Sequence, residues 1–304
     1  MVLSEDPRIE FVEAITQIRR EQVEDFLRPL IDAYYPDLLK RNDNEYRKMV
    51  ELSTKMMVVG QACTEIVGHT FDTRHQWISA LYGGCCFLAD SFIDDFGEKA
   101  ARDYLDRFEN LLQTGWFQIY NPREKLFYVI LSRLFTQRDV LDPLLRQAIM
   151  WLYQAQRRDV NIRLNAVTFR SLSRQRQLRL LRECARDRSG HAILVLSRFL
   201  VPDLPVEYHH LIFKAGALIM HIDDHGDYYA DIASGRITYM NQIRRPERTL
   251  RQIFQNTITL LESELPANHG RDLMLAFLYR YFVTRLKKKE LERKRSQASW
   301  TVYE

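Results

Sequence analysis

Two groups of aspartates have the residue types and the spacing for metal chemistry. The later group lies within residues 220–238 and consists of Asp223, Asp224, Asp227 and Asp231. On an α-helix, Asp224, Asp227 and Asp231 would lie within roughly 60° of one another. Like charges at such spacings repel one another and destabilise the helix. The group is therefore either a solvated acidic helix end or a set of carboxylates that binds a cation.

The earlier group lies within residues 88–98, which read L-A-D-S-F-I-D-D-F-G-E. Asp90 and Asp94 are four residues apart, so both carboxylates would project from one helix face, and Asp95 is turned away from Asp94 by about 100°. Mg²⁺ takes oxygen ligands, keeps several waters, and is usually shared between one or two carboxylates and substrate phosphates. Two such helix ends therefore predict a Mg²⁺ site that also takes a phosphate.

Clustered basic residues could neutralise the remaining charge of that phosphate. Seven arginines lie between Arg170 and Arg188, and Arg285 with Lys287 to Lys289 forms a basic end. Alone, these residues are typical of solvated helix faces; beside the acidic groups, they favour an anion site. Apolar, aromatic helix faces next to it would hold a hydrocarbon, so a hydrocarbon diphosphate fits all three features.

The composition indicates a folded, helical protein. Of the 304 residues, 46% are hydrophobic and 28% charged, whereas Gly (11) and Pro (9) are too scarce for a turn-rich β fold. The net charge of +4 is too small to imply a nucleic-acid partner. No apolar run approaches the ~18 residues of a membrane span. The four cysteines lack C-x-x-C spacing and the N-terminus lacks a secretion signal, so we expect a reducing cytoplasm without disulfides.

Hydrophobic periodicity predicts about ten helices and no confident strand. Pro29 should kink or split the first helix, and residues 187–190 should break the seventh. The predicted ranges are about 10–39, 45–68, 73–96, 98–113, 122–135, 141–165, 171–200, 205–233, 246–264 and 270–295. We therefore expect a single all-α domain of residues 1–304.

Both acidic groups resemble known motifs. The stretches D-S-F-I-D-D (90–95) and D-D-H-G-D-Y-Y-A-D-I-A-S-G-R-I-T-Y (223–239) are similar to the two Asp-rich motifs of class I isoprenoid synthases. The second is most similar to squalene and phytoene synthases and allied bacterial terpene synthases, in which a Gly-Arg-Ile turn likewise follows. The spacing of 133 residues between Asp90 and Asp223 suits that family. The chain departs from it by lacking D-D-x-x-D in the first motif and the Asn-Ser-Glu triad in the second.

The resemblance implies an antiparallel helical bundle around a central cavity, with the motifs on opposing helices. It also implies a terpene synthase that ionises a linear prenyl diphosphate to a hydrocarbon or alcohol plus diphosphate, with roughly two or three Mg²⁺ ions bound beside the diphosphate. Within the second motif, our order of preference for metal contact is Asp224, Asp227, Asp231, then Asp223. The implied metal ligands are Asp90, Asp94, Asp95, Asp223, Asp224, Asp227 and Asp231.

Further site residues are candidates on weaker grounds. Class I terpene synthases have a helix break near the position of residues 186–191, where an arginine senses the diphosphate. The resemblance therefore implies this role for Arg186 or Arg188. The alternative is an ordinary glycine kink with solvated arginines. Arg157 and Asn161 share a helix face, although a structural polar stripe is favoured there. Candidate substrate contacts are Phe87, Arg157, Asn161, Arg236, Arg280 and Tyr281.

Several alternatives remain open. Within the class, the closest alternative to a terpene synthase is an enzyme that condenses two prenyl diphosphates head to head. A chain-elongating prenyltransferase ranks third, because the sequence lacks its two D-D-x-x-D motifs. Outside that class, a non-catalytic helical scaffold would place the acidic groups apart on the outer surface, and a nucleic-acid-binding protein would bind with strong salt dependence. Zinc binding by His221 and His225 is a weak hypothesis. Contact with an anionic membrane surface, a homodimer, and the substrate chain length also stay open.

Overall fold

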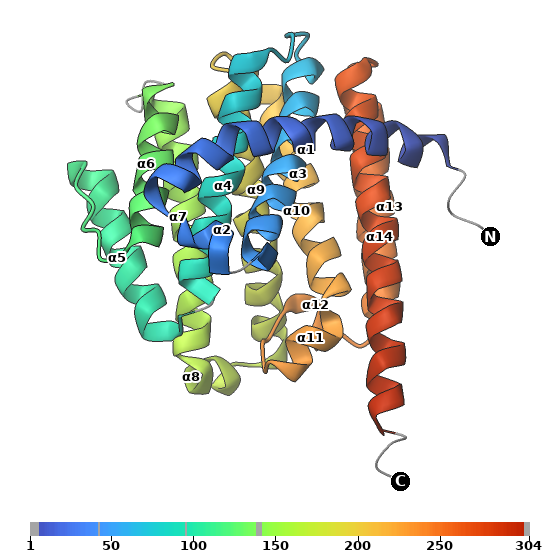
Figure 1. Ribbon diagram of the computed structural model, residues 1–304. Helices are drawn as coiled ribbons and strands as arrows, with labels where there is room; N and C mark the ends of the chain where they lie inside the picture. The colour runs from blue at the N-terminus through green and yellow to red at the C-terminus, as the bar shows by residue number, and fades with distance from the viewer. Residues whose placement is uncertain (1–5, 42, 95, 138–141, 301–304) are drawn as a thin grey trace.

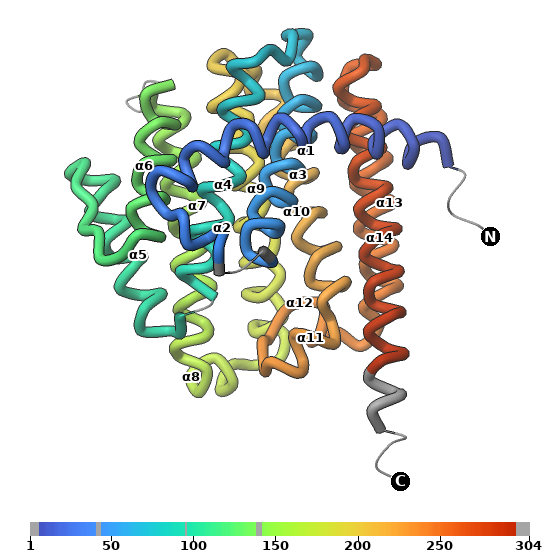
Figure 2. Tube along the Cα trace, in the orientation of Figure 1, coloured from blue at the N-terminus to red at the C-terminus, as the bar shows by residue number. Residues whose placement is uncertain are grey.

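The computed structural model describes residues 6–41, 43–94, 96–137 and 142–300 (Figures 1 and 2). These residues form fourteen helices and no strand, which confirms the all-α prediction. The helices are α1 (Pro7–Tyr34), α2 (Asp37–Arg41), α3 (Asp43–Ile66), α4 (Thr73–Asp94), α5 (Glu98–Thr114), α6 (Pro122–Thr136), α7 (Pro143–Leu164), α8 (Ala166–Ser171), α9 (Arg174–Leu200), α10 (Val206–Gly226), α11 (Tyr228–Ala233), α12 (Tyr239–Gln242), α13 (Pro246–Glu264) and α14 (His269–Trp300).

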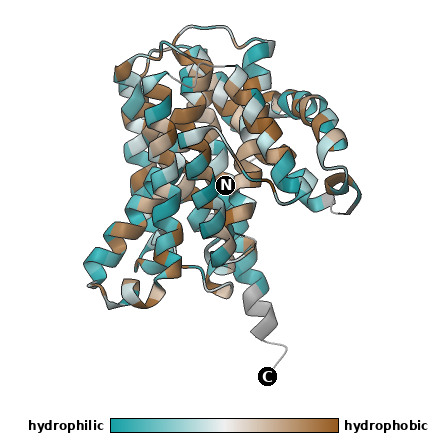
Figure 3. Cartoon of the chain, turned by 90° about the vertical axis from the view of Figure 1, so that its left-hand side faces the viewer, coloured by the Kyte–Doolittle hydropathy of each residue, from teal (hydrophilic) through white to brown (hydrophobic). Residues whose placement is uncertain are grey.

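The apolar helices occupy the middle of the bundle. Helix α4 buries Ile78, Leu81 and Leu88, and it packs against α3, α5, α6 and α9. Helix α10 packs along α9 and also contacts α13 and α14. Helix α1 runs across the bundle over α3, α4 and α14, while α8, α11 and α12 lie together at one end (Figure 1). Hydrophobic and hydrophilic residues alternate along most helices (Figure 3), as expected when each buries one face.

The predicted effect of Pro29 was wrong in part, because α1 runs through Pro29 without splitting. Its neighbours Leu27, Leu30 and Ile31 are buried, so packing holds the helix despite the hydrogen bond that proline removes. The helix ends instead at Tyr34, since Pro36 disfavours the α conformation at Tyr35. The first predicted helix is therefore two helices, α1 and α2.

The predicted break at residues 187–190 is also wrong, because α9 is continuous from Arg174 to Leu200. Glycine at position 190 instead permits close packing of α9 on α10. A Cβ atom there would lie 2.5 Å from the Phe213 ring, and one on Gly216 would lie 2.5 Å from the carbonyl oxygen of Ser189. The two glycines face each other across the helix pair, so their small size sets the helix spacing.

The predicted helix 205–233 is interrupted where the acidic motif stands. Helix α10 ends at Gly226, Asp227 has a non-helical conformation, and α11 begins at Tyr228. A Cβ on Gly226 would lie 2.9 Å from Cδ of Arg285 on α14, so this turn is also tightly packed. Asp224 and Asp231 consequently lie on two different helices, and the stripe expected on one helix does not form. None of the described helices is long and apolar enough to cross a membrane.

Candidate active site

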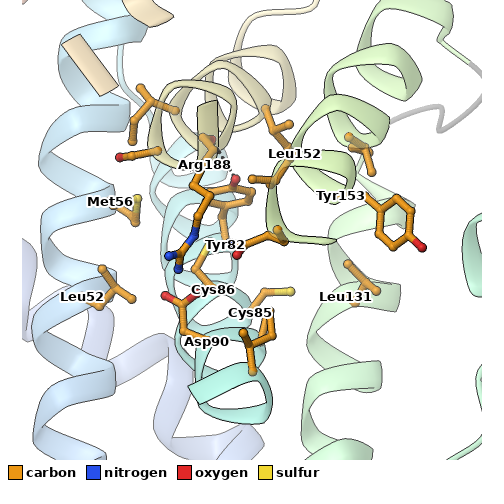
Figure 4. A pocket seen from close by; sticks show the side chains of 18 of the residues that line it. Leu52, Met56, Tyr82, Cys85, Cys86, Asp90, Leu131, Leu152, Tyr153 and Arg188 are labelled. Carbon is orange, nitrogen blue, oxygen red and sulfur yellow. Dashed lines mark hydrogen bonds between the residues drawn. The ribbon is translucent and has the colours of Figure 1, made fainter. Parts of the chain in front are cut away.

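An apolar cavity of about 210 Å³ lies among α3, α4, α5, α6, α7, α9 and α10 (Figure 4). Side chains of Leu, Ile, Met and aromatic residues form most of its wall. The only ionisable acidic or basic side chains that line it within the described chain are Asp90, Arg188 and Asp223. The aromatic residues are Tyr82, Tyr104, Phe108, Phe127, Phe135, Tyr153 and Phe199. Both acidic motifs therefore reach the same apolar space, one through α4 and the other through α10.

The first motif combines one poorly solvated carboxylate with one that arginines neutralise. Burial raises the pKa of Asp90 to about 6, although the charge of Arg188 opposes the shift. Figure 4 shows the guanidinium of Arg188 pointing toward the carboxylate of Asp90. One turn later, Asp94 accepts hydrogen bonds from Arg163 (Nη1–Oδ1, 3.1 Å) and Arg236 (Nη1–Oδ2, 3.2 Å). Asp90 is consequently the more available metal ligand of the two.

The second motif divides in the same way. Asp223 accepts a 2.5 Å hydrogen bond from the Tyr281 hydroxyl and pairs with Arg285 on α14. Asp227 pairs with Lys288, also on α14, and Arg285 lies 3.6 Å from it. These two carboxylates are therefore already neutralised by α14.

Asp224 and Asp231, by contrast, form no ion pair with a lysine or arginine within the described part of the chain. Burial, followed by the charge of Asp231, raises the pKa of Asp224 to about 8. Burial likewise raises the pKa of Asp231 to about 6. For Asp90, Asp224 and Asp231 alike, burial therefore outweighs the opposing charge of the nearby arginines.

The ion pair between Arg236 and Asp94 joins the two motifs directly, across 142 residues of sequence. Arg236 follows Gly235, whose φ of +73° gives the turn that glycine favours. Arg188, on α9, is only 8% exposed. Burial lowers the pKa of Arg188, but Asp159 and Asp90 more than offset this, so its guanidinium stays charged. Positive and negative groups from α4, α7, α9 and α10 thus converge at one end of the cavity.

Some of the other predicted site residues lie elsewhere. Arg186 is exposed and donates to Asp187, and it does not line the cavity. Arg280 donates to Glu13 of α1 and does not line the cavity. Phe87 packs against the core but is not among the cavity-lining residues.

Arg157 and Asn161 line a separate surface pocket together with Asn165 and Phe169. Arg157 is also paired with Asp106 at 2.7 Å. This face is therefore separate from the apolar cavity that Asp90 and Asp223 line. Asp95 lies outside the described residues.

Two residues at the site escaped the sequence analysis. Asp159 and Arg163, both on α7, form ion pairs with Arg188 and Asp94 respectively. Their four-residue spacing is an ordinary surface pattern on a helix. Only the packing of α7 on α9 distinguishes them, so no local signal could have found them.

The donor set fits a magnesium ion shared with a phosphate. Among the described residues, no three His, Cys, Asp or Glu side chains gather closely enough to hold a metal ion by themselves, which also leaves the zinc hypothesis without support. Mg²⁺ commonly uses one or two carboxylates, with waters and substrate phosphates as its other ligands. Asp90 and Asp224 lie near the C-terminal ends of α4 and α10, where the helix dipole adds negative charge. Poorly solvated carboxylates at two such helix ends favour a divalent cation that a phosphate helps to hold.

Comparisons with known proteins support the fold. No protein-family sequence profile matches the chain, and no curated protein sequence matches it. Among solved structures, linalool/nerolidol synthase from Streptomyces clavuligerus, in complex with 2-fluorogeranyl diphosphate, has a TM-score of 0.54 at 13% sequence identity. The match covers 90% of this chain and 95% of that one. The chain therefore has the fold of a class I terpene synthase.

Proposed function

We propose that the protein is a Mg²⁺-dependent terpene synthase that ionises a linear prenyl diphosphate to a terpene hydrocarbon or alcohol plus diphosphate. One observation carries the proposal: charged side chains of both acidic motifs and a buried arginine meet at a single cavity with aromatic walls. This arrangement argues against a scaffold or a nucleic-acid-binding protein, for which the acidic groups would have no reason to share an apolar space.

In the proposed site, Asp90, Asp224 and Asp231 would hold magnesium together with the substrate's diphosphate. The bound metal would supply Lewis-acid stabilisation of the leaving group. Arg188 and Arg236 would donate hydrogen bonds to diphosphate oxygens, and the C–O bond would break with its electron pair leaving on the diphosphate. Charge-assisted bonds of this kind are stronger than neutral ones and favour bidentate contact.

The cavity wall would then control the allylic cation. Faces of Tyr82, Phe108 and Phe199 can stabilise positive charge by cation–π interaction. The apolar wall limits the access of water, and water that does reach the cation would give an alcohol. The balance between hydrocarbon and alcohol therefore depends on how well these walls exclude water.

The cavity volume favours one short chain. A cavity of about 150 Å³ in another protein holds benzene, so by proportion 210 Å³ holds ~8 carbon atoms. Head-to-head condensation must place two prenyl chains in the site, and the present cavity is small for that. Of the alternatives within the class, a synthase acting on a single prenyl chain is the better fit, and the geranyl chain, which is shorter than farnesyl, comes nearest to the size of this cavity.

Product analysis tests this proposal. Geranyl, farnesyl and geranylgeranyl diphosphate are each incubated with the protein and Mg²⁺, and the organic extract is analysed by gas chromatography and mass spectrometry. We expect a terpene from at least one of them, and no product when EDTA replaces Mg²⁺. A product with the carbons of two substrates would show head-to-head condensation instead, and the absence of any product would refute the enzyme proposal.

We further propose that residues 1–304 form a single domain and that the protein works in the cytoplasm. All four cysteines are free thiols in the structure, which suits a reducing compartment. The proposed partner is the prenyl diphosphate.

A further inference from the structure

Arg188 makes fewer contacts than a buried structural arginine requires. Its guanidinium offers five N–H donors, yet within the described chain only Nη1 has an acceptor, Oδ2 of Asp159 at 3.2 Å. The Nε atom is buried and has no hydrogen-bond partner. Since an unsatisfied buried donor is costly, a purely structural role leaves most of this side chain unexplained. A ligand with several acceptor oxygens at the cavity would use it.

Of the described residues, only Asp159 accepts a hydrogen bond from the guanidinium of Arg188. It lies on α7 and presents the same oxygen, Oδ2, to Arg188 on α9 and to Nη2 of Arg163 at 3.3 Å. Arg163 in turn donates a hydrogen bond to Asp94. Four alternating charges, Arg188, Asp159, Arg163 and Asp94, therefore link the buried arginine to the first acidic motif.

We infer that Asp159 is a positioning residue, which holds Arg188 so that its free N–H groups face a diphosphate at the mouth of the cavity. This inference rests on the proposed function. Asp159 does not line the cavity, so it acts only through the arginine. Simple charge effects make the opposite prediction: removing a negative charge near an anion site should tighten anion binding.

Calorimetric titration with inorganic diphosphate in the presence of Mg²⁺ separates these two effects without requiring turnover. Asp159→Asn keeps the shape and removes the charge, and we expect it to weaken diphosphate binding about tenfold, the loss typical of one misplaced charge-assisted hydrogen bond. Arg188→Met should weaken binding at least as much. In the double variant, Asp159→Asn should add no further loss, because its effect depends on the arginine.

Glu124→Gln is the matched control. Glu124 is a buried acid that pairs with Arg107 at 2.8 Å, and it lies on α6, outside the cavity wall. Its substitution should lower the melting temperature but leave the diphosphate dissociation constant within about twofold of wild type. If Asp159→Asn does not fold, Asp159→Glu keeps the charge, displaces the carboxylate by one methylene, and should still weaken binding.

Wild-type affinity or tighter binding in the folded Asp159 variants would overturn the inference, as would losses that add in the double variant. Those results would leave the proposed function intact, because wild type would still bind diphosphate. No binding of diphosphate by wild type would overturn both.

Discussion

Asp224→Asn should make the ligand-free protein more stable, although it removes a proposed metal ligand. Burial and the charge of Asp231 raise the pKa of Asp224 from 3.8 to about 8. A carboxyl with a raised pKa binds its proton more tightly in the folded state than in the unfolded state. The ionised group therefore costs no stability below pH ~4, costs progressively more between pH 4 and 8, and costs most above pH 8.

The size of the effect follows from the shift in pKa. Each pKa unit corresponds to ~1.4 kcal/mol, so ionisation of Asp224 costs at most ~4 kcal/mol at pH 7. The true cost is smaller, because part of the shift comes from repulsion that Asp224 shares with Asp231, and because the side chain of Asp224 is only partly buried. We therefore expect Asp224→Asn to stabilise the protein by ~1–3 kcal/mol at pH 7. For a chain of this size, that raises the melting temperature by roughly 2–6 °C.

Thermal unfolding without Mg²⁺ at pH 5, 7 and 8 measures the effect. The gain from Asp224→Asn should grow with pH. Asp227→Asn is the matched control, because Asp227 is paired with Lys288, and its loss should lower the melting temperature. A melting temperature for Asp224→Asn at pH 8 that is equal to or below that of wild type would refute the reasoning, and so would a gain independent of pH.

Three further predictions concern the cavity wall, the helix spacing and α14. Phe135 lines both the cavity and a neighbouring apolar pocket, so its removal should join the two spaces. Phe135→Ala should therefore raise kcat/KM for the longest prenyl diphosphate about tenfold relative to the shortest. An unchanged ratio of the two kcat/KM values would contradict this. Gly216→Ala should lower stability in chemical denaturation by about 1–3 kcal/mol, since its Cβ would meet the Ser189 carbonyl oxygen at 2.5 Å; wild-type stability would show that α9 and α10 can move apart. Arg285→Met should weaken diphosphate binding and lower the melting temperature, because it leaves Asp223 without its cation. An unchanged dissociation constant together with an unchanged melting temperature would exclude a role for the Arg285–Asp223 ion pair.

Local sequence signals predicted the helices well wherever caps and apolar spacing agree. Residues 246–264 were predicted as a helix with the bounds that α13 has, and Pro246 stands at its first position. The prediction of a break near Gly190 was wrong because a glycine within a helical sequence has two explanations, a break in the helix and close packing against a neighbour. The Phe213 ring, which lies over Gly190, decides between them, and it comes from another helix.

Side-chain partners from distant helices were beyond prediction from the sequence. The sequence could place Asp90 and Asp223 on two acidic helix ends, and the structure brings both to one cavity. It could not rank Arg280 against Arg285. These two residues point to different sides of α14, toward Glu13 and Asp223 respectively, and that orientation depends on how α14 packs on α1 and α10.

The central claim is that both acidic motifs act together on one diphosphate. The release of inorganic diphosphate from farnesyl and geranyl diphosphate tests it most directly, with wild type, Asp90→Asn and Asp224→Asn compared with and without Mg²⁺. Asp72→Asn, at the opposite end of α4, is the control. We predict Mg²⁺-dependent release by wild type and the control, and a loss of at least about a hundredfold in each motif variant. Release that persists in either motif variant, or without Mg²⁺, would contradict the account.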